Sequence, residues 1–148
     1  MSTNDRILLD SIIQDKRAQI ASDMAEDDFF ELFLAEQLLW DHDLSWDELQ
    51  AGLTGGADDG GMDAIYIFCN GTLLDSSTDL SISPRGSATF ELIIIQAKRS
   101  PGFTETAIEK ISTSLLKLLD LNENLEDIRI LYNADTLACF DRVERSRL

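Results

Sequence analysis

Polar side chains end two stretches of the chain that are otherwise glycine-rich or apolar. Asp63 ends the run Asp58-Asp59-Gly60-Gly61-Met62-Asp63, and Gln96 and Lys98 fall in the run Ile93-Ile94-Ile95-Gln96-Ala97-Lys98. A lysine at the end of a buried strand is costly unless an anion lies beside it. A carboxylate, an amide oxygen and an ammonium at one sheet edge can hold Mg²⁺ and a water against a phosphodiester. We therefore predict that Asp63 and Lys98 share a pocket with an ion between them.

A simpler interpretation of Asp63 and Lys98 is a structural ion pair at the end of a sheet. The glycine-rich approach to Asp63 and the presence of Gln96 exceed what an ion pair requires, so we favour the ion site. Asp58 and Asp59 are residue types that commonly stabilise turns. A metal-binding role for Asp59 is therefore a secondary hypothesis.

Five of the eight glycines lie in residues 52–61, which we call the glycine-rich loop. It is not a P-loop, because no Gly-Lys-Ser/Thr follows, and it lacks the alternating acids and final Glu of an EF-hand. It also loosely matches a calcium-binding nonapeptide, but that motif works by repetition and occurs here once. The lone histidine, His42, is interpreted as a loop residue, and Trp40 and Trp46 beside it as packing residues.

Apolar periodicity predicts helices before the loop and a hairpin after it. We expect helices at residues 5–21 and 27–40 and a short helix to Ala51, which begins with the capping box Ser45-Trp46-Asp47-Glu48. Residue Asp27 or Asp28 is expected to cap the second helix. Residues 64–69 predict a strand that turns at Asn70-Gly71 and pairs back through residues 72–74.

The second half predicts a strand, a helix and a further strand. Residues 90–97 are typical of a central strand covered on both faces, and residues 75–87 of an exposed connection. Thr104 is expected to cap a helix to about Leu121, with Phe103 packing on Ile108. The expected inner side of that helix comprises Ala107, Ile108, Ile111, Leu115, Leu118 and Leu119. Residues 128–132 predict a strand parallel to residues 90–97, which completes a right-handed βαβ unit.

Length and composition indicate one ordinary globular domain. The chain has 148 residues, 44% hydrophobic and 27% charged, enough for a sizeable core. No apolar run approaches the roughly 20 residues that span a bilayer, so we expect no membrane partner. Because the first residues lack a signal-peptide pattern and the two cysteines lack ligand-like spacing, we expect a cytoplasmic protein with reduced thiols.

The net charge of −16 is unusual for a protein that binds nucleic acid, because such proteins draw affinity from Lys and Arg on phosphates. The acid is uneven: residues 23–48 are rich in Asp and Glu and contain no Lys or Arg. Two explanations stay open. Either other domains or a second subunit, as in a homodimer, supply positive surface, or the partner is not nucleic acid.

The order of these elements, with Asp-Gly-Gly-Met-Asp before a hairpin and Gln-Ala-Lys after the next strand, resembles the PD-(D/E)XK nuclease superfamily. It is similar to the Mrr-like branch, in which Gln replaces the second acid. Within that branch, Phe29 to Ile111 resembles the N-terminal nuclease region of abortive-infection phage-resistance (AIPR) proteins. The resemblance implies a single α/β domain, residues 1–148, with a restriction-endonuclease-like α-β-β-β-α-β core and a mixed central sheet flanked by helices. The chain could be the N-terminal fragment of a longer protein.

The resemblance also implies roles for individual residues. Asp63 and Gln96 would bind Mg²⁺ (or Mn²⁺), together with the backbone carbonyl of Ala97 and, as a weaker candidate, Asp59. Lys98 would orient the attacking water and stabilise charge that develops in the transition state. Gln96, a neutral ligand, would bind the metal more weakly than a Glu.

The family also uses a Glu from the preceding helix, for which Glu31 and Glu36 are the candidates. On a helical wheel at ~100° per residue, Glu31 lies beside Leu34 and Leu38, next to the apolar face, whereas Glu36 lies away from them. Glu31 is therefore the first choice.

Two functions follow as hypotheses. The first is a divalent-metal-dependent nuclease domain that hydrolyses phosphodiester bonds in DNA, with RNA left open, in phage defence. The second is an inactive nuclease-like module that binds or regulates a basic partner through an acidic surface, which the net charge of −16 favours.

Overall fold

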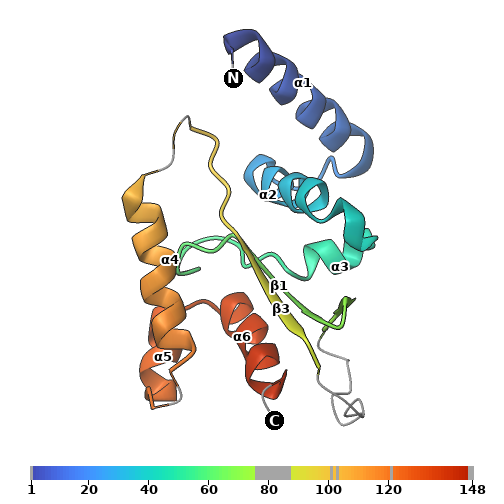
Figure 1. Cartoon of the computed structure of the whole chain (residues 1–148). Helices are drawn as coiled ribbons and strands as arrows, with labels where there is room; N and C mark the ends of the chain where they lie inside the picture. Colours follow the sequence, from blue (N-terminus) through green and yellow to red (C-terminus); the bar gives the residue numbers. More distant parts are fainter. Residues whose placement is uncertain (1, 76–87, 101, 103, 121, 147–148) are drawn as a thin grey trace.

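A small antiparallel sheet lies between groups of helices (Figure 1). The computed structural model describes residues 2–75, 88–100, 102, 104–120 and 122–146. Its elements are α1 (Thr3–Ile20), α2 (Glu26–Leu38), the 3-10 helix η1 (Trp40–His42), α3 (Trp46–Gln50), β1 (Ala64–Cys69), β2 (Thr72–Leu73), β3 (Phe90–Ile95), α4 (Glu105–Leu118), α5 (Leu125–Leu131) and α6 (Ala134–Ser146). Within the described part, no helix is both long and apolar enough to cross a membrane. The architecture is mixed α and β.

The described strands form one sheet in the order β2-β1-β3, with both pairs antiparallel. The β1–β3 register runs from Ala64 opposite Ile95 to Cys69 opposite Phe90. The predicted turn at Asn70-Gly71 is confirmed, since both residues have positive φ (50° and 82°), as this type of tight hairpin requires. The predicted strand of residues 64–69 is therefore the centre of the sheet.

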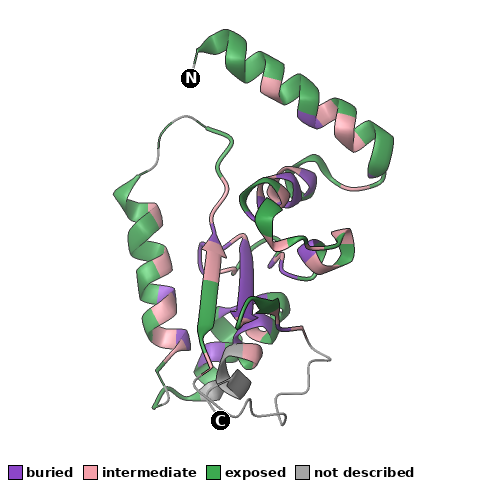
Figure 2. Cartoon of the chain, turned by 45° about the vertical axis from the view of Figure 1, so that its right-hand side comes forward, coloured by how far each residue is buried: buried purple, intermediate pink, exposed green. Residues whose placement is uncertain are grey.

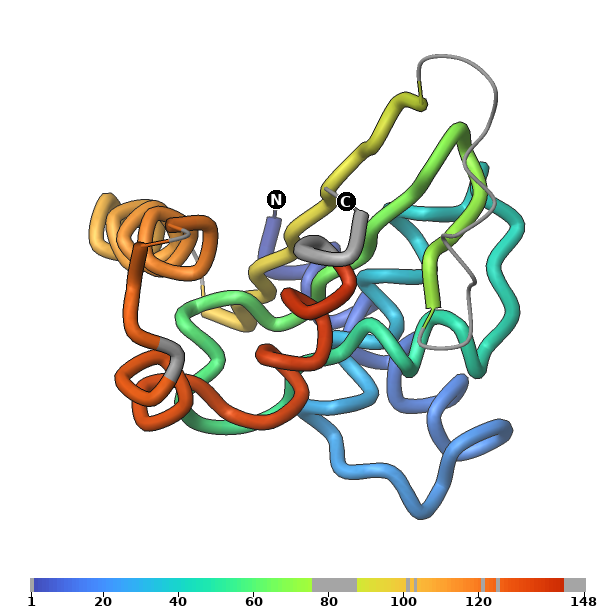
Figure 3. Tube along the Cα trace, turned by 90° about the horizontal axis from the view of Figure 1, so that it is seen from below, coloured from blue at the N-terminus to red at the C-terminus, as the bar shows by residue number. Residues whose placement is uncertain are grey.

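Alternate residues of β1 pack against different helices, as the pleat of a strand dictates. Ala64, Tyr66 and Phe68 join a core with α2 and α3, while Ile65 and Ile67 join a core with α4, α5 and α6. Figure 2 shows β1 buried between these layers, whereas much of β3 is exposed. Seen from below, α4 and α5 lie side by side, away from α1–α3, with the glycine-rich loop and the strands between (Figure 3).

The predicted N-terminal helices are confirmed within one to two residues of their bounds. The capping box of Ser45 and Glu48 is also present at the start of α3. α2 differs in its cap, because Ala25 occupies that position without a side-chain hydrogen bond, and Asp27 and Asp28 lie in the first turn. There their charges favour the positive end of the helix dipole.

Two predictions about the sheet are wrong. Residues 90–95 form a strand, but β3 pairs only with β1 among the described residues and is an edge strand. Residues 128–132 belong mostly to helix α5, which Asn124 caps by accepting a hydrogen bond from the Glu126 backbone (3.1 Å). Ile128 and Tyr132, four residues apart, are buried, while Ile130 between them is 81% exposed. This is the burial pattern of a helix rather than of a strand, and the apolar run in the sequence did not reveal it. The predicted βαβ unit and the final strand of the α-β-β-β-α-β core are therefore absent from the described residues.

Four smaller expectations also need correction or fall outside the described residues. Ile108 is 64% exposed, although it was expected on the inner side of α4, and Trp40 is 79% exposed, although it was expected to pack. The sequence did not predict α6, whose apolar residues Cys139 and Phe140 are buried. The predicted staple of Phe103 and most of the connection of residues 75–87 lie outside the described residues.

Candidate active site

Asp63 lies immediately before β1, where it is tied to the end of β3. Its backbone N–H donates to the carbonyl of Ile95 (2.9 Å), and its side chain accepts a hydrogen bond from the backbone N–H of Ala97 (2.5 Å). Continuing the register by one pair places Gln96, which is half-buried, opposite Asp63. The two stretches singled out in the sequence therefore meet at one end of the sheet.

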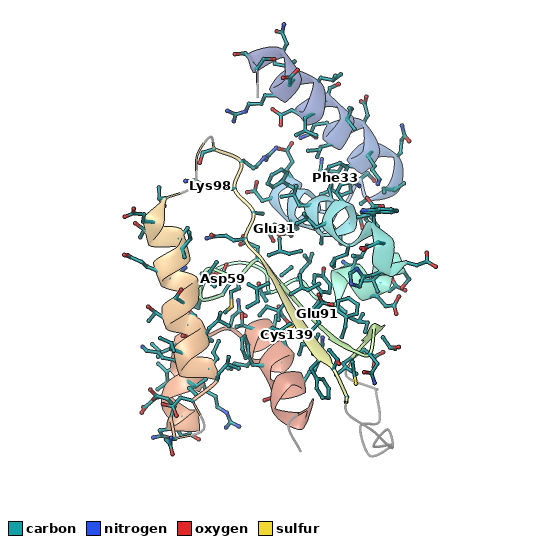
Figure 4. All side chains as sticks on the ribbon, viewed as in Figure 1. Glu31, Phe33, Asp59, Glu91, Lys98 and Cys139 are labelled. Atoms are coloured by element: carbon teal, nitrogen blue, oxygen red, sulfur yellow. The ribbon has the colours of Figure 1, made fainter. Side chains whose placement is uncertain are left out.

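Lys98 does not form an ion pair with Asp63, which was the simpler interpretation of the two residues. Its side chain is exposed and makes no hydrogen bond or ion pair with the described residues. Figure 4 shows it beyond the end of β3. The Asp63 carboxylate instead accepts the Ala97 N–H, and an exposed ammonium keeps its hydration. The requirement that Lys98 find a buried anion fails because β3 is an edge strand and Lys98 follows its end.

Glu31 projects from α2 into the neighbourhood of the other acids. Burial is the main cause that raises the pKa of this half-buried carboxyl, followed by the negative charges of Asp63, Asp28, Asp59 and Asp27, and together they bring it to about 7. Figure 4 shows Glu31 between α2 and the end of β3, and Asp59 on the glycine-rich loop beside α4. Carboxylates from three separate segments therefore influence one another.

Asp63 is the second perturbed acid. Burial raises its pKa, as does the charge of Asp59, while the Ala97 N–H and the Lys110 ammonium act in the opposite direction. Raised carboxyl pKa values in a group of acids are common at functional sites. The free energy of the ionised site would fall if a cation joined it.

Glu36, the alternative to Glu31, is directed elsewhere. It forms an ion pair with Lys16 of α1, and Lys16 also lies over the ring of Phe33 (5.4 Å to the centroid). Glu31 and Glu36 are five residues apart, so they lie on different faces of α2. The helical-wheel preference for Glu31 agrees with this arrangement.

Asp59 connects the glycine-rich loop to α4. Its carboxylate accepts the Gly61 backbone N–H (2.7 Å) and lies 3.5 Å from the Lys110 ammonium. Gly60 has φ +70°, and its carbonyl accepts a hydrogen bond from the Ser114 hydroxyl (2.9 Å). A Cβ at Gly60 would lie 2.7 Å from that hydroxyl and 2.9 Å from the Tyr132 ring. Only glycine allows the loop to approach α4 this closely.

Asn133 fixes the other half of the same loop, and sequence reasoning missed it. Its side-chain amide donates to the carbonyls of Thr54 (2.9 Å), Gly55 (2.8 Å) and Ala57 (3.1 Å). Its side-chain oxygen accepts the Thr136 N–H (2.8 Å) at the start of α6. An Asn three residues before that N–H is a helix-capping pattern, which was the available signal.

Arg99 fixes the segment that carries Lys98. Its guanidinium lies 3.1 Å from Asp27 and 3.6 Å from Glu26 in the first turn of α2, and 5.4 Å from the centroid of the Phe30 ring. Its carbonyl accepts a hydrogen bond from Arg6 of α1 (3.0 Å). The segment after β3 is therefore held to the helix that bears Glu31.

The donor atoms at this site are of the type that Mg²⁺ prefers. Among the described residues, no three Asp, Glu, His or Cys side chains are grouped closely enough to hold a metal as they stand. The chemistry of the set nevertheless fits a hard cation, because Glu31, Asp59 and Asp63 offer carboxylate oxygens, Gln96 offers an amide oxygen, and Mg²⁺ keeps several waters. Side-chain rotation would have to bring these oxygens together.

His42 lies outside this group of acids. Its ring packs on Phe68 (centroids 4.4 Å apart) and its Nδ1 lies 2.9 Å from the Asp41 carboxylate. His42 is the last residue of the 3-10 helix η1 rather than the loop residue that was expected.

The chain was compared with models of protein families, with curated proteins and with solved structures, and it matches none of them. The function must therefore be inferred from the residues and their geometry.

Proposed function

We propose that this chain is a divalent-metal-dependent nuclease domain that hydrolyses phosphodiester bonds of nucleic acid, within the PD-(D/E)XK superfamily that it resembles. The observation that carries the proposal is the hydrogen bond from the Ala97 N–H to Asp63, which ties Asp63 to the segment that bears Gln96 and Lys98. The charges of Asp63 and Asp59 also act on Glu31 and help to raise its pKa, so a cation would stabilise the ionised form of these acids.

The residues would have two roles, metal binding and stabilisation of the phosphate in the transition state. Asp63, Gln96 and Glu31, assisted by Asp59 and the carbonyl of Ala97, would hold Mg²⁺ or Mn²⁺. The ion would polarise the phosphoryl oxygen and lower the pKa of a bound water. Lys98, exposed and without a partner among the described residues, is available to donate to the phosphate and stabilise charge that develops in the transition state.

The biological setting of this proposal comes from the resemblance to AIPR proteins, which points to phage defence in the cytoplasm. DNA is the preferred substrate, and RNA is the alternative. A homodimer or additional domains would supply positive surface that a chain of net charge −16 lacks.

A cleavage panel tests the proposal. Single- and double-stranded DNA and RNA are incubated with the protein in Mg²⁺, Mn²⁺ or EDTA. We expect metal-dependent cutting that Asp63→Asn and Lys98→Ala each reduce by at least about a hundredfold. Lys16→Gln removes a lysine of α1 that pairs with Glu36 of α2. This variant should cut like the unmodified protein. If the Asp63 and Lys98 variants cut as fast as the unmodified protein, the assignment is refuted.

The acidic N-terminal region favours one second candidate. Residues 23–48 contain no Lys or Arg, and Trp40 and Leu38 there are 79% and 61% exposed. Exposed aromatic residues among acids suit binding of a basic protein segment. Calorimetric titration with Mg²⁺ separates the candidates. A nuclease binds the ion through Asp63, so Asp63→Asn abolishes the heat of binding. A binding module gives no heat of Mg²⁺ binding that depends on Asp63.

A further inference from the structure

A pocket of about 460 Å³ lies beside the candidate active site, between the glycine-rich loop, α4 and the end of α5. Gly60 contributes to its wall from the loop and Tyr132 from the end of α5. Its volume is in the range of pockets that bind small ligands. Glu31, Asp59 and Asp63 are not among its lining residues, so it is distinct from the acids assigned to the metal.

One face of α4 presents hydrogen-bond donors to this pocket. Thr106, Lys110, Thr113 and Lys117 all line it. They are spaced by four, three and four residues, which places them in one row on a helix. A row of two ammonium groups and two hydroxyls is suited to the oxygens of a phosphate.

The two lysines differ in what they contact. The Lys110 ammonium lies 3.5 Å from Asp59, whereas the side chain of Lys117, a half-buried residue, makes no hydrogen bond or ion pair with the described residues. In a chain of net charge −16, a half-buried ammonium without an acidic partner is a locally positive point. Two acids, Asp58 and Glu109, also line the pocket. Neutralising one of these acids should change the affinity for an anion in the opposite direction to neutralising a lysine.

We infer that this pocket binds a phosphate of a nucleic-acid strand, with Lys117 and Lys110 as the charged donors. The inference rests on the proposed function and extends it, because it places the strand along α4. Lys110 contacts both the pocket and Asp59, so a strand held there lies next to the acids that would bind the metal. Local phosphate contacts of this kind let a strongly acidic chain bind nucleic acid without a wide basic surface.

The test is binding of a fluorescein-labelled oligothymidylate of about 12 nucleotides, followed by anisotropy in EDTA so that no cleavage intervenes. Lys117→Gln should weaken binding by about tenfold, as expected for loss of one charge-assisted hydrogen bond. It should also reduce the slope of log K against log salt by roughly 0.7. Glu109→Gln should tighten binding, and Lys16→Gln, which makes the same charge change outside the pocket, should leave it within about twofold.

Each other result overturns the inference. Unchanged affinity in Lys117→Gln excludes the pocket, and equal loss in Lys117→Gln and Lys16→Gln shows that only net charge matters. If inorganic phosphate binds to the pocket in calorimetry but the oligonucleotide does not, the ligand is a free phosphate rather than a strand. Thermal unfolding of each variant verifies the fold.

The outcomes for the pocket and for the proposed function are separable. Metal-dependent cleavage with unaltered binding in Lys117→Gln would refute the pocket and leave the nuclease. Binding through Lys117 by a protein that cuts no substrate would refute the nuclease and retain the pocket as a site for nucleic acid.

Discussion

The two sides of the candidate site, α2 and α4, differ in electrostatic character. Glu31 on α2 has no basic partner within the described residues, and its pKa rises to about 7 through burial and neighbouring acids. On α4, Lys110 pairs with Asp59 and Lys117 faces a pocket. Between residues 23 and 48, which include α2, there is no Lys or Arg at all. The α2 side is therefore purely acidic, whereas α4 carries acids and lysines together.

This difference bears on how a chain of net charge −16 could bind the proposed substrate. The α2 side concentrates carboxylates where a divalent cation would lower the electrostatic free energy, and the α4 side offers ammonium groups where a phosphate would do so. Asp59 and Lys110 lie at the boundary and contact one another. A metal and a phosphate would meet at this boundary, which is where hydrolysis requires both.

The two sides also differ in how firmly they are held. Ser114, Asn133 and Lys110 all bind the glycine-rich loop on the α4 side, whereas Glu31 depends on the packing of α2 alone. We therefore expect the largest stability effects from changes on the loop and smaller, pH-dependent effects on the α2 side.

The strongest test of the loop side is Gly60→Ala. A Cβ there would lie within 2.9 Å of the buried Tyr132 ring, at φ +70°, so both strain and overlap act. We expect a loss of about 3 kcal/mol in the free energy of unfolding, measured with urea. Gly56→Ala is the matched control, because φ is +74° but nothing lies within 4 Å of the added atom, and it should cost about 1 kcal/mol. Equal losses would mean that the close approach to α4 is not required.

The α2 side is tested by the pH dependence of stability in EDTA. The folded-state pKa of Glu31 is about 7 against an ordinary value of 4.5, so the unfolded chain releases this proton first. The contribution of Glu31 to the free energy of unfolding is therefore most favourable below about pH 4.5, falls as the pH rises to about 7, and is least favourable above that. Glu31→Gln should remove this part of the fall, about 1–2 kcal/mol after discounting for partial exposure.

Glu36→Gln provides the control for Glu31→Gln. Glu36 lies on the same helix and pairs with Lys16, so Glu36→Gln should lower the free energy of unfolding slightly and leave the decline of stability toward neutral pH intact. Urea unfolding at several pH values measures both variants. If the free energy of unfolding of Glu31→Gln still falls steeply as the pH rises toward neutral, Glu31 is not the cause of the decline and the proposed crowding of acids at this site is contradicted.

Sequence reasoning recovered what local signals specify. The capping box at Ser45, the turn at Asn70-Gly71 and the strand between residues 64 and 69 were predicted correctly, because each depends on near neighbours in the chain. The run of residues 128–132 was not, since a short apolar run fits a strand and a helix equally and Ile130 gave no signal of its exposure. The edge position of β3 depended on the absence of that strand, so one error produced the other.

In the candidate site, too, local signals could be predicted from the sequence and contacts between distant segments could not. The sequence predicted that Asp63 and the residues after the strand of residues 90–97 meet at one sheet edge, and Asp63 does approach the end of β3; the choice of Glu31 followed from helical geometry. The contacts of Lys110 with Asp59 and of Asn133 with the loop join segments about 50 to 80 residues apart in the sequence, and nothing local encodes them. The simpler interpretation of Asp63 and Lys98 as an ion pair is wrong because it assumed a buried strand end, whereas Lys98 is exposed.

The smallest expected effect on stability, and the sharpest test of how α2 is linked to Lys98, is Arg99→Gln. The ion pairs of Arg99 with Asp27 and Glu26 are exposed, so unfolding free energy should fall by less than about 1 kcal/mol. Cleavage should slow roughly fivefold in kcat with KM unchanged, because Lys98 loses its anchorage and transition-state stabilisation weakens. Arg99→Lys, which can keep one contact with Asp27, should recover part of the rate. Arg129→Gln, which breaks a comparable exposed pair with Glu126 on α5, should leave kcat unaltered. Equal rates in Arg99→Gln and Arg129→Gln would show that the α2 side does not position Lys98 at all.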